Sequence, residues 1–196
     1  MNAPPTPLPL PAGGVALDLA PHRNNAGCHS RSLIAAEGLD GFGRAFSAHG
    51  LQAAAAALGF PEQWGEGEPD NVACEGQTLE LAAPLKASAL HVAGVAAGGS
   101  TAGVFRLGHG DAATSADTTV RVRLADFLAR LPAEHSVLFA EADFLYDIAG
   151  RTQRRAQPRM WLATVPLPGS TLCTRVELPV NPDLHVFGVW LTPDDT

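Results

Sequence analysis

The sequence lacks three features that would place it in a well-marked class of protein. It has no apolar run of the roughly 18 residues that a membrane-spanning helix requires, so no membrane span is predicted. It has few cations, 13 Lys and Arg against 20 Asp and Glu, and the formal net charge of −7 disfavours a nucleic-acid backbone as partner. Its three cysteines, Cys28, Cys74 and Cys173, are irregularly spaced, which argues against a disulfide framework and leaves a single bridge open.

The N-terminus lacks the pattern of a secretory signal. No basic residue precedes its apolar residues, and five prolines interrupt them. We therefore expect residues 1–14 to be a flexible proline-rich leader and residues 15–196 to form a single domain. The protein is expected to be cytoplasmic as written, or secreted if a signal has been removed. The chain also has no nucleophile elbow, P-loop, dinucleotide fingerprint or HExxH motif, so no common motif assigns a reaction.

The sequence does contain many short apolar runs separated by Gly, Pro, Asp and Ser, which is typical of strands joined by turns. Residues 118–124 alternate between apolar and polar side chains and predict a half-buried antiparallel strand. Residues 184–191 carry apolar side chains on both faces, with His185 as the polar exception, and predict a central strand covered on both faces. One short helix is predicted from Ser47 to Leu58, ended by Gly59. Together these patterns predict an all-β protein, an antiparallel β-sandwich with one short helix.

Three separated patterns carry a resemblance to a known family: DLAPHRNNAG, GEPDNVACEGQTLEL and NPDLHVFGVWL. With GLDGFGRAFSAHGLQAAAAA, they resemble the jelly-roll accessory domain, a carbohydrate-binding-like module attached to bacterial glycoside hydrolases and other secreted enzymes. The resemblance covers nearly all of Val15 to Leu191. It implies a galactose-binding-like jelly roll and, for this chain, a stand-alone module that binds a carbohydrate or glycoside. The chain departs from the family at Cys28 and His29, where the family has a small or aliphatic residue followed by Ser or Asp.

Sugar recognition needs an aromatic platform and planar polar side chains. Trp64 lies in a loop rich in Gly and Glu, without a strand to pack into, and we expect it to stack on a neutral glycan or glycoside. Phe42 and Trp161 are further aromatic candidates, although Trp161 lies in an apolar run that is typical of a core. The other predicted ligand-binding residues, most of which would hold the loops around the site, are Asn24, Asn25, Asp70, Asn71 and Tyr146.

Two loops contain the oxygen ligands that calcium prefers. Asp40 and Asp70 could hold a structural calcium ion, and no other cofactor is expected. The alternative is that these residues form turns in which the side chain bonds the nearby backbone.

An enzyme is the alternative class of function. It would be a small cofactor-free lyase, isomerase or cyclase, with His22, His29, Glu141 and Asp143 as acid–base candidates. The segment AEADFLYD also offers Tyr146 and Asp147 for this chemistry. The stretch APHRNNAGCHS, which carries both histidines, is otherwise explained as a structural loop, because asparagine bonds its own backbone readily. An exposed aromatic beside a shallow groove would favour a binding module, and a closed pocket with convergent ionisable side chains would favour an enzyme.

The most basic segment is RTQRRAQPR, residues 151–159. Its arginines could grip an anionic group by bidentate hydrogen bonds, or they could be solvated surface. The expected partner is a small molecule or glycan, and the sequence does not assign an oligomeric state.

Overall fold

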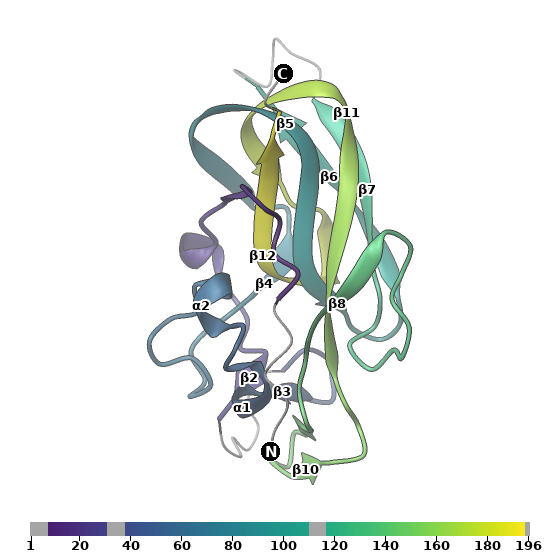
Figure 1. Ribbon diagram of the computed structural model, residues 1–196. Helices are drawn as coiled ribbons and strands as arrows, with labels where there is room; N and C mark the ends of the chain where they lie inside the picture. The colour runs from purple at the N-terminus through teal and green to yellow at the C-terminus, as the bar shows by residue number, and fades with distance from the viewer. Residues whose placement is uncertain (1–7, 31–37, 110–116, 195–196) are drawn as a thin grey trace.

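Two long antiparallel strands, β5 (Thr78–Ala96) and β11 (Arg159–Glu177), organise the fold (Figure 1). The structure is a computed structural model that describes residues 8–30, 38–109 and 117–194. The two strands belong to an antiparallel sheet of order β1-β12-β5-β11-β6-β7, in which β4 also pairs with β12 and β8 with β11. The other strands of this sheet are β1 (Val15–Ala16), β4 (Val72–Glu75), β6 (Thr101–Gly108), β7 (Thr118–Leu124), β8 (Ser136–Glu141) and β12 (Val180–Pro193).

The large sheet bends and packs against itself. The register between β5 and β11 shifts between Pro166 and Thr171, and irregularities of this kind increase the local twist of a sheet. Leu124 of β7 packs over Gly94 of β5, where a Cβ atom would lie 2.9 Å from Leu124 Cδ1. The space enclosed in this way is filled by a first core, which includes Leu79, Leu90, Val92, Phe105, Leu107, Val122, Leu124, Val176, Leu184 and Val186. The predicted all-β sandwich is confirmed.

A second core covers the opposite face of the central strands. Val92 belongs to the first core and Ala93 to the second, as the alternation of a strand requires. The ring of Phe46 is fully buried there, between Phe127 at 6.3 Å and Phe187 at 6.0 Å between ring centroids. Burial of one such side chain contributes about 1.5–3 kcal/mol to stability. The central strands of the large sheet are therefore apolar on both faces.

A small sheet and two helices form the layer over this second core (Figure 1). The small sheet has the order β10-β9-β3-β2, with only β2 and β3 parallel. Its strands are β2 (Cys28–His29), β3 (Ala45–Ser47), β9 (Leu145–Tyr146) and β10 (Thr152–Gln153). The helical elements are η1 (Ala20–His22), α1 (Ala48–Leu51) and α2 (Ala55–Leu58). In Figure 1, β10 lies at the end of the molecule opposite to the C-terminus.

Both strand patterns singled out in the sequence behave as predicted. In β7, Val120, Val122 and Leu124 are buried while Arg121 and Arg123 are exposed. In β12, residues 184–191 are all buried and are divided between the two cores.

The single helix predicted from Ser47 to Leu58 is two short helices instead. Between α1 and α2 the chain tightens into i→i−3 hydrogen bonds, of which the one from Ala54 N to Leu51 O is 2.8 Å long. Leu51, Ala54 and Leu58 all reach the second core, as they would on one face of a continuous helix. Gly59 ends α2 in the left-handed conformation at φ 58°, as expected.

The segment before β1 is described only from Leu8 onward. Leu8 packs against the second core, and Leu10 is 43% exposed. The flexibility expected of residues 1–14 stays a prediction, and residues 1–7 lie outside the described residues. No helix in the described ranges has the length and apolar character that crossing a membrane requires.

Candidate functional site

Four of the predicted ligand-binding residues meet in one polar network that is mostly buried. Asn71 is fully buried, and its Nδ2 donates to Asn25 Oδ1 at 3.0 Å and to Asp70 Oδ1 at 2.8 Å. Its Oδ1 lies 2.9 Å from His185 Nδ1, so the imidazole donates to Asn71. Asn24 joins the network at the surface by binding both the N–H and the carbonyl of Ala73. The network connects the loop after η1 to β4 and β12.

The carboxyl group of Asp70 is the centre of this network. It is fully buried and accepts hydrogen bonds from the backbone of Gly27 at 3.0 Å and of Cys28 at 2.9 Å. Burial raises the pKa of Asp70 to about 6, and the hydrogen bonds from Asn71, Gly27 and Cys28 oppose that rise. The polar atoms of these residues are thus used to hold loops together.

Trp64 and Tyr146, the two aromatic residues predicted to contact a ligand, are both at least partly buried. Trp64 is half-buried, and its ring packs against Phe60 at 4.7 Å between centroids. Tyr146 is 8% exposed in β9, with its ring 6.3 Å from that of His29. Trp161 is buried, as its apolar run predicts, and its Nε1 donates to Asp126 O.

The candidate catalytic residues are distributed over different elements. His22 ends η1, whereas His29 is buried in β2. Glu141 ends β8, and its Oε2 lies 2.6 Å from Arg159 Nε, while Asp143 is exposed in the loop that follows. An acid–base role for these residues stays a prediction.

The donor sets around Asp40 and Asp70 do not fit a calcium ion. Both carboxylates accept hydrogen bonds from N–H groups, whereas calcium requires converging oxygen ligands. Within the described ranges, no cluster of three or more His, Cys, Asp or Glu side chains could hold a metal ion. Asp40 instead organises a tight turn.

Asp40 and Asp147 build two turns of the same design. Oδ1 of Asp40 accepts from the backbone N of Phe42 at 3.0 Å and of Arg44 at 3.2 Å, and its Oδ2 binds the Arg44 guanidinium at 2.6 Å. Each turn therefore holds one arginine by a charge-assisted contact, in which two guanidinium nitrogens bind one carboxylate oxygen.

The second turn repeats these contacts between Asp147 and Arg151, which are also four residues apart. Oδ1 of Asp147 accepts from the backbone N of Ala149 and of Arg151, both at 3.0 Å, and its Oδ2 binds the Arg151 guanidinium at 3.0 Å. Backbone hydrogen bonds lower the pKa of Asp147, because they favour its charged form. Gln153 also donates to Asp147 Oδ2, at 3.1 Å.

The two turns pack against each other and enclose a shallow groove, here called the Phe42 groove. Ile148 N donates to Phe42 O at 3.2 Å, which joins the turns directly. The groove has a volume of about 450 Å³ and is lined by Phe42, Arg44, Leu128, Leu145, Asp147, Ile148, Arg151, Gln153 and Ala156. Phe42 is 69% exposed, and the Arg44 guanidinium lies 5.3 Å from the centre of its ring. The arrangement offers an open aromatic face beside guanidinium and amide groups.

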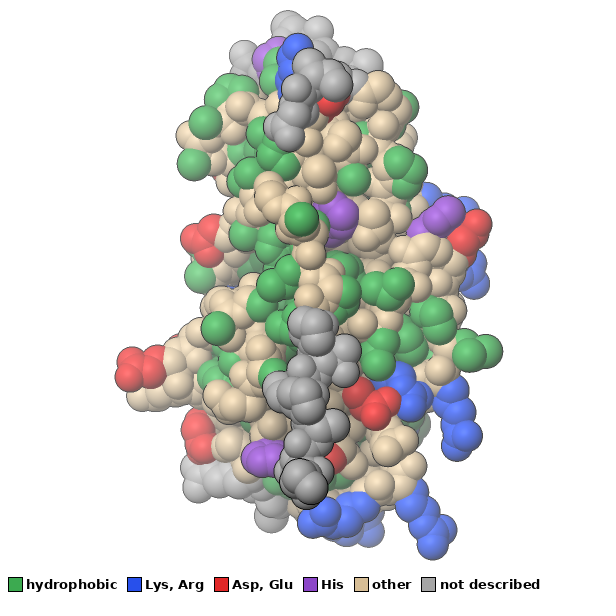
Figure 2. All heavy atoms as spheres, in the orientation of Figure 1, with side chains coloured by type: hydrophobic (Ala, Val, Ile, Leu, Met, Phe, Trp, Pro, Cys, Tyr) green, Lys and Arg blue, Asp and Glu red, His purple; other side chains and the backbone are tan. Residues whose placement is uncertain are grey.

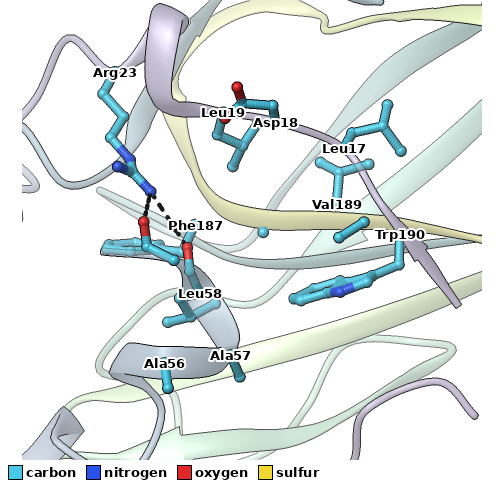
Figure 3. Close-up of a pocket in the computed structure, with 13 residues that line it drawn as sticks. Leu17, Asp18, Leu19, Arg23, Ala56, Ala57, Leu58, Phe187, Val189 and Trp190 are labelled. Atoms are coloured by element: carbon cyan, nitrogen blue, oxygen red, sulfur yellow. Dashed lines mark hydrogen bonds between the residues drawn. The ribbon is translucent and has the colours of Figure 1, made fainter. Parts of the chain in front are cut away.

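A second cavity, of about 370 Å³, lies between the segment after β1, α2 and β12 (Figure 3). Figure 3 shows Phe187, Val189 and Trp190 on one side of it, with Asp18 and Arg23 as its charged residues. The Arg23 guanidinium donates to the carbonyls of Leu58 and Gly59 and so caps the end of α2. Trp190 is only 6% exposed. Because Arg23 is committed to a structural contact, we regard the Phe42 groove as the better candidate site.

Comparison with models of known protein families and with curated proteins found no match to this chain.

Sequence reasoning considered Phe42 but preferred Trp64, and it left two meanings open for the arginines of residues 151–159. It missed Arg44 and Ile148, and it considered Asp147 only as an acid–base candidate. A signal was present, because DGFGR and DIAGR both have the form Asp-x-x-Gly-Arg. The repeat of that spacing could have linked the two turns.

Proposed function

We propose that this chain is a carbohydrate- or glycoside-binding module whose ligand lies in the Phe42 groove. The observation that carries the proposal is the exposed Phe42 ring beside hydrogen-bonding side chains held in place by Asp40 and Asp147. The apolar face of a sugar ring packs on an aromatic side chain, and its hydroxyl groups bind planar donors and acceptors.

The turns favour binding for an energetic reason as well. Arg44 and Arg151 are already ordered by their aspartates, so less side-chain entropy is lost when a ligand binds them. The stacking role that the sequence suggested for Trp64 passes to Phe42 in this proposal, because Trp64 packs against Phe60.

The test is titration calorimetry of the full chain against a panel of neutral and acidic oligosaccharides. For a ligand that binds, Phe42→Ala should weaken affinity roughly tenfold or more, since it removes the stacking surface. Val180→Ala is the matched control, because Val180 is 80% exposed and does not line the groove. Wild-type affinity in Phe42→Ala would contradict the assignment of the groove. If no oligosaccharide of the panel binds and a metabolite screen detects turnover, the cofactor-free enzyme would be favoured instead.

A further inference from the structure

The Phe42 groove lies in the most cationic part of a chain that is acidic as a whole. Residues 147–159 carry four arginines and one aspartate, although the formal net charge of the chain is −7. Figure 2 shows Lys and Arg side chains gathered at the end of the molecule where Figure 1 places β10.

Two of these four arginines, and Arg44 of the other turn, are neutralised by a neighbouring carboxylate. Arg44 pairs with Asp40, Arg151 with Asp147, and Arg159 with Glu141. Arg154 and Arg155 form no ion pair with any described residue, and both are exposed. Two adjacent positive charges therefore remain uncompensated.

The position of these two arginines relates them to the groove. They occupy a turn closed by the hydrogen bond from Ala156 N to Gln153 O, at 3.2 Å, and both Gln153 and Ala156 line the groove. The guanidinium of Arg154 packs on the ring of Phe144 in a cation–π contact, 5.3 Å from the ring centre. Arg154 and Arg155 thus lie between two residues that line the groove.

We propose that the ligand of the Phe42 groove is an acidic glycan, one whose sugar residues carry a carboxylate or sulfate group. This inference rests on the proposed function and replaces the neutral glycan expected from the sequence. The sugar ring packs on Phe42, and its anionic group binds Arg154 and Arg155. A guanidinium matches the oxygen atoms of either anion by paired hydrogen bonds, and an anion also relieves the repulsion between the two adjacent cations.

The charge of the rest of the molecule adds selectivity. The acidic residues elsewhere on the chain disfavour contact with a polyanion, so an acidic glycan is directed to the cationic rim. Binding should therefore weaken as salt is added, because the two arginines are exposed to the solvent.

The test compares glycans that share a backbone and differ in charge. The full chain is titrated with polygalacturonate and with its methyl-esterified form, and separately with dextran sulfate and with dextran. We expect tighter binding to the acidic member of at least one pair, and the pair that responds distinguishes a carboxylate from a sulfate. In Arg154→Gln/Arg155→Gln, affinity for the acidic glycan should fall roughly 10- to 100-fold, as expected for charged hydrogen bonds.

The matched control is Arg121→Gln/Arg123→Gln, which removes the same charge from the exposed side of β7, outside the groove. It should leave affinity within roughly twofold of wild type, because distant exposed charges are screened. Equal effects of the two double variants would overturn the inference, since net charge alone would then explain binding. Preference for the neutral glycans, abolished by Phe42→Ala, would overturn the inference and leave glycan binding intact. Binding to none of the four would overturn both proposals.

Discussion

The Nδ1 atom of His185 lies 2.9 Å from Oδ1 of Asn71, a residue 114 positions away in the sequence. Asn71 also donates to Asp70, so a single amide separates a buried imidazole from a buried carboxyl group. Burial acts on the two groups in opposite directions, because it disfavours the charged form of each. It raises the pKa of Asp70 to about 6 and lowers the pKa of His185 to about 4.

These two shifts predict opposing effects on stability between about pH 4 and pH 6. The contribution of Asp70 is fully present below its unfolded pKa of about 4 and is lost as pH rises through about 6. The contribution of His185 is present above its unfolded pKa of about 6.5 and is lost as pH falls through about 4. Each amounts to something on the order of 2 kcal/mol, so the two largely cancel in the wild-type protein.

Single variants should expose each contribution in turn. Relative to wild type, Asp70→Asn should lose stability as pH is lowered from 6.5 to 4, and His185→Gln should gain stability as pH is lowered from 6 to 4. Urea unfolding at several pH values measures both slopes. Both variants will also be destabilised at every pH by lost hydrogen bonds, so only the pH dependence is diagnostic. Deviations of the same sign in the two variants would refute the account.

Gly43 is predicted to be required for the contact between the two turns that form the groove. Its φ is 63°, and a Cβ atom there would lie 2.9 Å from Cβ of Ile148. Gly43→Ala should cost about 1–2 kcal/mol from backbone strain alone, and it should weaken ligand binding by displacing Ile148. Gly41→Ala is the control, because no heavy atom lies within 4 Å of the added methyl group. Thermal unfolding of the two variants gives the comparison, and equal melting temperatures would show that the turn tolerates the side chain.

The three cysteines are predicted to be unreactive until the protein unfolds. Cys28, Cys74 and Cys173 are all buried and unpaired. Burial raises the pKa of the Cys74 thiol to about 12 and of the Cys173 thiol to about 11, and it raises that of Cys28 as well. An aromatic disulfide reagent at pH 8 should find no thiol in the native protein and all three in denaturant. Rapid reaction of any cysteine in the native state would mean that its surroundings open readily.

The strands could be predicted because their signals are local. In β7 the alternation of valine with arginine indicates which face is buried, and in β12 the apolar residues at both even and odd positions indicate burial on both faces. The helix was predicted at the right place but as one element. Its division between Leu51 and Ala55 is a local change to i→i−3 hydrogen bonds, which the alanine run does not encode.

The polar residues were harder to interpret, because the same side chain can bind a ligand or hold a loop. The sequence predicts that Asp70 and Asn71 hold loops around a ligand site, and the partners of Asn71 include His185, which no local pattern connects to it. Trp64 looked exposed in its glycine-rich loop, and only the fold shows that Phe60 packs against its ring.

The sequence by itself therefore determined the all-β class and the buried faces of β7 and β12, since both depend on the periodicity of neighbouring residues. The tertiary structure alone decided the site. Phe42 and Ile148 belong to turns that are far apart in the sequence. They meet because each turn is organised by its own aspartate, and because the backbone N–H of Ile148 donates to the carbonyl of Phe42. A groove formed by two such segments is a property of their packing, which no single stretch of sequence contains.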